Sequence, residues 1–337
     1  MGIKDLSKIV KKYPNCIKYF PIDEFKNKRI AFDGNNLFRK YWSTSCKNVV
    51  SNMTVTDVIN TNEILNLAID NILKFIIKLL YHKITLIFVF DGGVLKQKQE
   101  VIKKRKESKE KAREDFRKIK EVIEDDIFNV TKEKEEEFKM RQRNSISPSF
   151  KDMKRFQEVL ESLGIPILIS TDEAERLCVS LYLDGKIDGV YTNDRDVLAF
   201  GCKVFLEEIV EDENRQKYFR FYSLEALLEE MEFTFEQFVD LCIMLSCDYN
   251  ERIFKVGPKK CEEYIRKYKK IEAVPIDTSC LNHEICREIF KHKPSDDLTL
   301  EGSINLSYCE YEYDYELYSA MNIRKEAEII IALKRNC

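Results

Sequence analysis

The chain has 337 residues, of which 44% are apolar and 34% charged, a composition that allows one large or two modest globular domains. Its 56 basic and 59 acidic residues nearly cancel, so net charge by itself favours no class of partner. No apolar run approaches the ~20 residues that cross a bilayer. The opening MGIKDL lacks a secretory core and the myristoylation pattern, so we expect neither a membrane protein nor a secreted one.

Apolar patterns of two kinds alternate along the chain. The segment 84–90 (ITLIFVF) is apolar on both faces, which is typical of a buried parallel strand, whereas 61–81 has the 3.6-residue period of a helix. Further strands are expected at 29–32, 165–169, 188–192 and, at an edge, 204–208; further helices follow Leu37, span 156–163, begin at Asp172 and dominate from Leu224 onward. Strands that alternate with helices predict an α/β fold with a doubly wound, mainly parallel sheet.

Acidic residues directly follow three of the expected strands. Asp33, Asp91 and the pair Asp194 and Asp196 each lie just past a strand's carboxyl end, the edge at which open α/β sheets bind ligands. A single acid there is usually a solvated loop residue. Three strands that each deliver one are hard to explain by folding alone.

Three other acids have equally good structural interpretations. Ser170 and Glu173 have the spacing of a capping box, and Glu175 would suit the first turn of the same helix. Asp248 follows an apolar stretch and could be an ordinary loop residue. The residues alone leave both possibilities open.

Any metal in this protein should have oxygen ligands. The 11 cysteines include no C-x-x-C pair and are expected to be reduced thiols, and the 3 histidines fit no zinc pattern. Carboxylates without histidine suit Mg²⁺ or Mn²⁺. Two such ions, about 4 Å apart, offset the repulsion between crowded acids and promote phosphodiester hydrolysis. The sequence therefore predicts an acid-rich, metal-dependent phosphoryl-transfer site.

The acids lie in five recognisable segments: IAFDGN, FVFDGG, GIPILISTDEAERLC, YTNDRDVLAFG and FVDLCIMLSCDYNERIFKVGPKKCEEYI. Together with MGIKDL, these segments resemble the flap endonuclease/XPG family of structure-specific 5′ nucleases, over residue 1 to about residue 274. The resemblance implies a PIN-like nuclease core, a helical arch and a helix-turn-helix annex. It also implies two Mg²⁺ ions, for which Mn²⁺ could substitute.

The family's metal-binding acids all have counterparts here: Asp33, Asp91, Glu173, Glu175, Asp194, Asp196 and Asp248. The resemblance places the first four nearest one ion and the last three nearest the other. It implies a catalytic role for Asp33, Asp91 and Asp194, and for the basic pair Lys98 and Arg105.

A charged segment follows the second acid. Residues 96–120 contain twelve lysines and arginines against five acids, and residues 121–137 reverse the sign. By composition this is a solvated helix with i,i+4 ion pairs, or a nuclear address at KKRK (103–106). The resemblance implies an arch over the active site, in which Lys98 and Arg105, two helical turns apart, hold the scissile phosphate.

The segment KVGPKK (255–260) resembles the family's helix-turn-helix loop, which grips duplex DNA. Lys255 replaces the first glycine of the usual Gly-x-Gly, and a positive φ there would be strained. A plain surface turn is the alternative. The residues expected to contact DNA are Gly2, Lys103, Lys104, Gly257, Lys259 and Lys260.

The segments expected from these observations are a nuclease core at 1–95 and 146–235, an arch at 96–145, a helix-turn-helix region at 236–275 and a divergent segment at 276–337. Within the last, 308–318 alternates aromatic and acidic residues and could be an edge strand or a duplex-facing rim. Arg39 replaces an aromatic that flap-specific members tend to carry, and Phe38 or Tyr41 could substitute.

The resemblance implies a metal-dependent endonuclease that cuts branched, 5′-flap DNA in replication, repair or recombination. The alternatives are a 5′–3′ exonuclease or junction resolvase of the same family, or a DNA-binding scaffold without catalysis, which the complete set of acids disfavours. The segment DGNN after the first strand excludes a dinucleotide-binding dehydrogenase. We expect a monomer without a sliding-clamp peptide. It would act inside the cell, in the nucleus or, for a divergent viral member, at a viral DNA replication site in an infected host cell.

Overall fold

The computed structural model describes residues 2–93, 98–299, 304–309 and 313–334. Its helices are α1 (Leu6–Val10), α2 (Gly34–Ser51), α3 (Thr61–Tyr81), α4 (Gln99–Asp125), α5 (Lys132–Ser145), α6 (Phe150–Ser162), α7 (Ala174–Leu183), α8 (Leu224–Met231), α9 (Phe235–Leu245), α10 (Pro258–Tyr268), α11 (His283–Phe290), α12 (Tyr315–Ala320) and α13 (Arg324–Lys334). Its strands are β1 (Ile17–Pro21), β2 (Arg29–Asp33), β3 (Thr85–Phe90), β4 (Ile167–Ile169), β5 (Gly189–Tyr191), β6 (Val204–Glu211) and β7 (Lys217–Ser223). No helix among the described residues is long and apolar enough to cross a membrane.

The chain forms two compact units, each assembled from separate stretches of sequence. The first comprises Met1–Asn36, His82–Lys98 and Pro166–Ser307, and the second comprises Leu37–Tyr81, Gln99–Ile165 and Tyr308–Cys337. The five segments expected from the sequence are functional divisions, and they stay a prediction.

The first unit contains one sheet of seven strands in the order β1-β7-β6-β5-β2-β3-β4. The five strands from β6 to β4 run parallel, because each is separated from the next by helical or irregular chain. Phe32 lies opposite both Phe88 and Tyr191, at ring separations of 5.3 and 5.0 Å, so the three central strands are in register. The predicted α/β fold with a mainly parallel sheet is confirmed.

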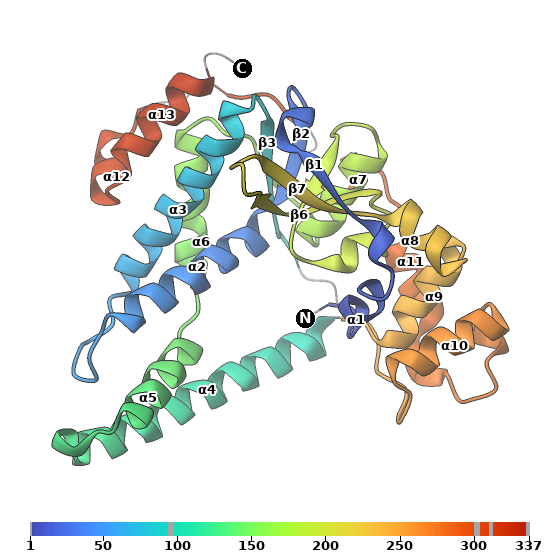
Figure 1. Ribbon diagram of the computed structural model, residues 1–337, viewed down its shortest axis with the longest axis horizontal. Helices are drawn as coiled ribbons and strands as arrows, with labels where there is room; N and C mark the ends of the chain where they lie inside the picture. Colours follow the sequence, from blue (N-terminus) through green and yellow to red (C-terminus); the bar gives the residue numbers. More distant parts are fainter. Residues whose placement is uncertain (1, 94–97, 300–303, 310–312, 335–337) are drawn as a thin grey trace. The chain divides into compact units, whose positions relative to one another are not determined.

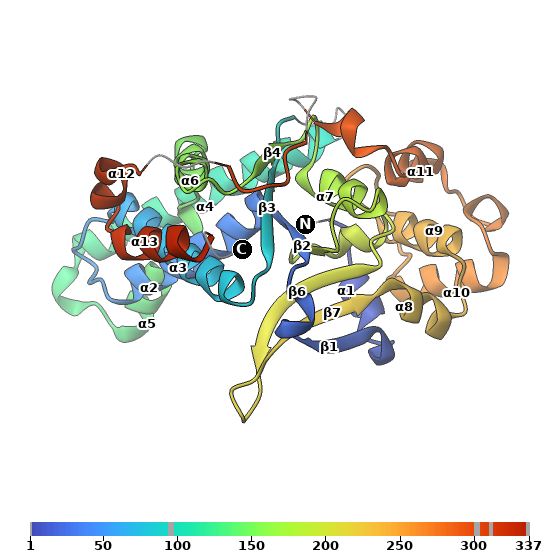
Figure 2. The same ribbon diagram turned by 90° about the horizontal axis from the view of Figure 1, so that it is seen from above.

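Two features of the sheet differ from the sequence expectation. The strand expected at an edge, 204–208, lies inside the sheet between β5 and β7 and continues to Glu211. It pairs antiparallel with β7 in a hairpin (Figure 2), and β1 then pairs with the outer side of β7. The pattern of β7, KYFRFYS, mixes charged and aromatic residues and gave no strand signal before its partners were known.

Besides α1 and α7, the first unit contains the four helices α8, α9, α10 and α11. Helices α10 and α11 both pack against α9, next to α8 (Figure 1). Arg287 of α11 donates to both oxygens of Asp240 on α9 at 2.7 Å and also pairs with Glu272. A single guanidinium therefore joins three segments of this helical annex.

The second unit is helical. Its core includes Phe38 of α2, which stacks on Phe156 of α6 at 5.2 Å, and α13 packs along α3 (Figure 2). Helices α4 and α5 form a long antiparallel hairpin (Figure 1), joined by Phe116 and Phe138 at 5.3 Å.

The expected strand at 308–318 is wrong for the residues that the structure describes. Residues 308, 309, 313 and 314 are irregular, α12 begins at Tyr315, and 310–312 lie outside the described residues. Asp314 caps this helix by accepting from the N–H of Leu317 at 2.8 Å. The cap and the following apolar positions outweigh the β propensity of the tyrosines.

Candidate active site

The seven candidate acids all lie in the first unit, and six of them follow the carboxyl ends of neighbouring strands. Asp33 ends β2, Asp91 follows β3, Glu173 and Glu175 begin α7 after β4, Asp194 and Asp196 follow β5, and Asp248 follows α9. Parallel strands bring these six positions to one edge because their carboxyl ends all point the same way.

Hydrogen bonds from the backbone hold several of these carboxylates. Asp33 accepts from the N–H of Asn36 at 2.9 Å, in the first turn of α2, and Asp91 accepts from the N–H of Ala174 at 2.9 Å. The second bond joins the end of β3 to the start of α7. Thr192 donates to Asp33 at 3.5 Å and accepts from the N–H of Asp194 at 3.1 Å, so it links the ends of β2 and β5.

The start of the chain packs against the last two acids. The N–H of Ile3 donates to Asp196 at 2.8 Å, and the N–H of Gly2 donates to Asp248 at 3.4 Å. Gly2 has φ +93°, and a Cβ there would lie 2.6 Å from an oxygen of Asp196. The close approach and the positive φ both require glycine. Gly2, expected as a DNA contact, lies against the acids.

Lys98 lies among the same acids. Its Nζ is 2.8 Å from Glu173 and 3.3 Å from Asp248, and it sits 5.1 Å from the ring centroid of Tyr249, whose hydroxyl donates to Glu173 at 2.7 Å. Burial alone would lower the pKa of Lys98, but Glu173, Glu175 and Asp248 raise it overall, so the ammonium stays charged.

The basic pair is not contained in one helix. Helix α4 begins at Gln99, so Lys98 immediately precedes it, while Arg105 lies within it. Arg105 belongs to the second unit. The expected arch had placed both residues on one helix, two turns apart.

Burial and, after it, repulsion between neighbouring charges raise the pKa of two of the acids. Burial raises the pKa of Glu175, and the charges of Asp194, Asp33 and Asp196 raise it further. Burial and Asp194 likewise raise the pKa of Asp196, to which Asp248 adds. Buried carboxylates that repel one another favour bound cations, and an all-oxygen donor set suits hard divalent ions.

The carboxylates do not form a complete metal cage by themselves. Among the described residues, no three acidic, histidine or cysteine side chains converge closely enough to hold one ion. Lys98 instead places its positive charge between Glu173 and Asp248. The donor set fits divalent ions in chemistry and burial, and binding them would require side chains to rotate towards a common centre.

The capping-box interpretation of Glu173 is wrong. Ser170 pairs with Asp172, whose carboxylate accepts from the N–H of Glu173 at 2.7 Å. Glu173 itself is the N-cap residue of α7 but makes no side-chain cap bond. Because Asp172 is hydrogen-bonded in this way, the side chain of Glu173 is available to Lys98 and Tyr249.

The expected DNA-contacting lysines are exposed. Lys103 and Lys104 lie on α4, and Lys259 and Lys260 lie in the first turn of α10, whose N-cap is Gly257. Lys255 has φ +59°, so the position does require the left-handed conformation that glycine adopts without strain.

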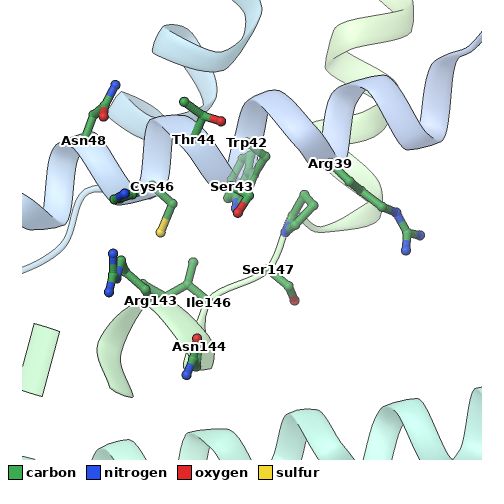
Figure 3. A pocket seen from close by; sticks show the side chains of 12 residues that line it. Arg39, Trp42, Ser43, Thr44, Cys46, Asn48, Arg143, Asn144, Ile146 and Ser147 are labelled. Carbon is green, nitrogen blue, oxygen red and sulfur yellow. The ribbon is translucent and has the colours of Figure 1, made fainter. Parts of the chain in front are cut away.

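The second unit contains a cavity of about 600 Å³ (Figure 3), which no sequence pattern had indicated. It lies between α2 and residues 143–148, at the end of α5, and its lining includes Arg39, Lys47 and Arg143 but no acidic residue. Because the two walls are about 100 residues apart in sequence, no local pattern could have revealed it.

One of the two suggested replacements for the missing aromatic is wrong. Phe38 is fully buried in its stack on Phe156 and cannot reach a ligand. Tyr41 packs 6.1 Å from Phe75, and burial raises its pKa to about 12. Arg39 itself is exposed and lines the cavity.

Comparisons with known proteins agree with this arrangement. Residues 1–112 match the XPG N-terminal domain and residues 164–248 match the XPG I-region. Flap endonuclease 1 of Entamoeba histolytica is 32% identical over 326 residues, covering 96% of this chain and 82% of the relative. Flap endonuclease 1 of Entamoeba dispar is 34% identical over 275 residues, covering 81% and 69% respectively.

Solved structures show the same fold. The catalytic core of Rad2 in complex with DNA substrate has a TM-score of 0.63 at 20% identity, covering 98% of this chain and 100% of that one. Flap endonuclease-1 from Methanococcus jannaschii has a TM-score of 0.61 at 18% identity, with 95% and 96% covered. From the domain matches and the identity to its relatives, this chain belongs to the flap endonuclease/XPG family of nucleases.

Proposed function

We propose that this protein is a metal-dependent, structure-specific 5′ endonuclease that hydrolyses phosphodiester bonds in branched 5′-flap DNA during replication, repair or recombination. Family membership supports the nuclease activity. The observation that carries the proposal is the gathering of acidic side chains from four strand ends in one unit, with Lys98 ion-paired to Glu173 and Asp248.

The acids Asp33, Asp91, Glu173, Glu175, Asp194, Asp196 and Asp248 would hold two Mg²⁺ ions, or Mn²⁺ in their place. Such ions lower the pKa of water and offset charge on a phosphate. Tyr249 orients one oxygen of Glu173, and the backbone at Gly2 and Ile3 orients Asp248 and Asp196. Lys98, charged and 17% exposed, would bind the scissile phosphate, with Arg105 as its partner.

Basic residues away from the acids would bind the rest of the substrate. Lys259, Lys260 and the backbone at Gly257 would hold phosphates of the duplex, without reading base sequence. Lys103 and Lys104 on α4 would contact the displaced single strand. The cavity lined by Arg39, Lys47 and Arg143 would bind the same strand, because its lining carries positive charge and no acidic residue. We further propose that the protein acts as a monomer, in the nucleus or at a viral DNA replication site in an infected host cell.

The test is a cleavage panel of flap, gapped, nicked and four-way DNA, assayed with Mg²⁺. Asp194→Ala should lower 5′-flap cleavage by more than about a thousandfold, because it removes an acid needed for charge stabilisation in the transition state. Binding of the flap DNA should be largely retained. Asp188→Ala is a matched control, because Asp188 lies at the opposite end of β5. Near-normal cleavage by Asp194→Ala would refute the assignment, and preferred cleavage of four-way DNA would favour a junction resolvase.

A further inference from the structure

The turn between α9 and α10 presents an exposed aromatic ring. Phe254 is 83% exposed, whereas Ile253 and Val256 on either side of the turn are only 8% and 9% exposed. The N–H of Val256 donates to the carbonyl of Ile253 at 3.2 Å, which places Phe254 and Lys255 at the two corners of a β-turn. The buried pair anchors the turn and directs the corner residues outward.

Arg252 also stabilises the turn, in addition to the buried residues Ile253 and Val256. Its Nε donates to the carbonyl of Val256 at 3.3 Å, and its Nη2 pairs with Asp5 at 2.9 Å. Phe254 therefore stands on a fixed backbone. An aromatic ring presented in this way loses little conformational freedom when it binds a partner.

The turn itself does not need a lysine or an aromatic ring at its two corners. Lys255 occupies the left-handed region at φ +59°, where glycine would be unstrained. Its Nζ lies 5.1 Å from the centroid of the Phe254 ring. Residues 251–260 include four basic side chains and one acidic one, and Lys259 and Lys260 on α10 are exposed. The ring therefore lies beside one cation, Lys255, in a segment whose basic side chains outnumber its acidic ones.

An apolar ring beside a cation matches the chemistry of a sugar-phosphate backbone. The backbone of nucleic acid alternates anionic phosphates with sugars, whose carbon faces are apolar in DNA but carry a hydroxyl in RNA. A protein surface with the opposite charge and an apolar centre would place its cations on phosphates and its ring on the sugar between them. A 2′-hydroxyl pressed against the ring would lose its hydrogen bonds to water.

We propose that Phe254 packs against a deoxyribose of a DNA duplex bound at this turn, with Lys255 beside an adjacent phosphate, and that this contact makes the protein prefer DNA to RNA duplexes. The inference deepens the proposed function, because it assumes that the same surface binds the duplex part of the substrate. It adds a sugar-selecting residue to a surface otherwise expected to act through charge.

The experiment measures binding of the full chain, in EDTA, to fluorescent 20-base-pair duplexes of one sequence made of DNA, RNA or either DNA·RNA hybrid. Phe254→Ala should weaken binding to the DNA duplex roughly five- to tenfold, as expected for loss of one apolar contact. Binding to RNA should change little, so the preference for DNA falls by a similar factor. The slope of log affinity against log salt should stay the same, because no charge is removed.

Two variants serve as controls. Phe150→Ala removes an equally exposed ring, also 83% exposed, from the start of α6 and should leave all affinities unchanged. Lys259→Ala should lower the salt slope by about 0.9, the contribution of one phosphate contact, without changing the preference for DNA.

Affinity of Phe254→Ala for DNA equal to that of the unmodified chain would overturn the inference, and so would equal weakening on DNA and RNA. Failure of the unmodified chain to bind any duplex would also overturn it. Cleavage of a 5′-flap substrate with Mg²⁺ is measured separately. If the unmodified chain cleaves the flap while Phe254→Ala binds DNA normally, only this inference fails. If Phe254→Ala loses the preference for DNA but the unmodified chain cleaves nothing, only the proposed function fails.

Discussion

Several acids at the sheet edge also connect distant parts of the backbone. Asp91 accepts from Ala174, 83 residues away, and Asp196 accepts from Ile3, 193 residues away. Each bond fixes one oxygen of a carboxylate whose other oxygen is left for further contacts. The same side chains therefore contribute to folding and to the proposed chemistry, and replacing them should affect both.

Lys98 is the residue whose replacement best separates phosphate binding from metal binding. Lys98→Gln should reduce flap cleavage roughly a hundredfold, because a cation near the transferred phosphate is lost. Affinity for Mn²⁺ should rise, since the ammonium no longer competes for Glu173 and Asp248. Single-turnover cleavage and Mn²⁺ titration measure the two effects. Lys203→Gln, which removes an exposed ion pair with Glu225, is the control. Weaker Mn²⁺ binding in Lys98→Gln would contradict this role.

Gly2 tests whether the start of the chain positions the acids. Gly2→Ala should reduce cleavage at least tenfold, because the new Cβ would lie 2.6 Å from Asp196 in a backbone conformation with φ +93°. Gly185→Ala introduces similar strain, at φ +70°, into open space and should leave cleavage unchanged. Thermal unfolding of both variants measures the strain separately from activity. Equal cleavage by the two variants would show that Gly2 has no positioning role.

At the scale of elements, the helical annex depends on one buried ion pair. Asp240 is 5% exposed at its side chain and is held by Arg287 and by the N–H of Ile271. Arg287→Met should lower the free energy of unfolding by about 2 kcal/mol, because it leaves a buried carboxylate without its cation. Duplex binding should weaken with it, since α10 packs in the same annex. Lys291→Met, which removes an exposed partner of Glu288 in the same annex, provides the comparison.

The same variant has a defined pH dependence. The hydrogen bond from Arg287 lowers the pKa of Glu272 from its ordinary 4.5 to about 2, although burial opposes the shift. A carboxylate with a lowered pKa stabilises the fold above its ordinary pKa and loses that contribution as pH falls towards the lowered value. The stability difference between the unmodified chain and Arg287→Met should therefore shrink between pH 4.5 and 2. Denaturant unfolding at several pH values measures this difference; a constant difference would exclude a role for Glu272.

For the whole molecule, the crowded acids predict that divalent ions act as folding ligands. Burial and like charges raise the pKa of Glu175 and Asp196, so the ionised cluster destabilises the metal-free protein near neutral pH. At an ion concentration about a hundred times Kd, Mn²⁺ should stabilise the fold by about 2.7 kcal/mol. Thermal unfolding in EDTA and in Mn²⁺ measures this effect.

Glu175→Gln tests whether repulsion among the acids destabilises the metal-free protein. It should raise the unfolding temperature in EDTA, because one repelling charge is gone, and reduce the stabilisation by Mn²⁺, because one ligand is gone. Asp212→Asn, on the β6–β7 turn, should change neither. An unfolding temperature that does not respond to Mn²⁺ would argue against a metal site built from these acids.

Local sequence patterns were sufficient to predict the parallel part of the sheet. Runs such as 84–90 are apolar on both faces wherever they lie, and an acid after such a run must emerge at the sheet's carboxyl edge. The alternation of strands and helices therefore predicted the fold class, and the family resemblance pointed to the same seven acids. Their assigned roles as metal ligands stay a prediction.

The parts of the fold and of the candidate site that the sequence could not predict depend on contacts between distant segments. Four features join positions that are between 75 and 205 residues apart in sequence: Lys98 bridging Glu173 and Asp248, Gly2 pressed against Asp196, the pairing of β1 with β7, and the cavity lined by Arg39 and Arg143. Charge and hydrophobic periodicity describe only what a residue favours near its own backbone. Which of several lysines meets a given carboxylate depends on how the elements pack, so only the folded chain could identify that partner.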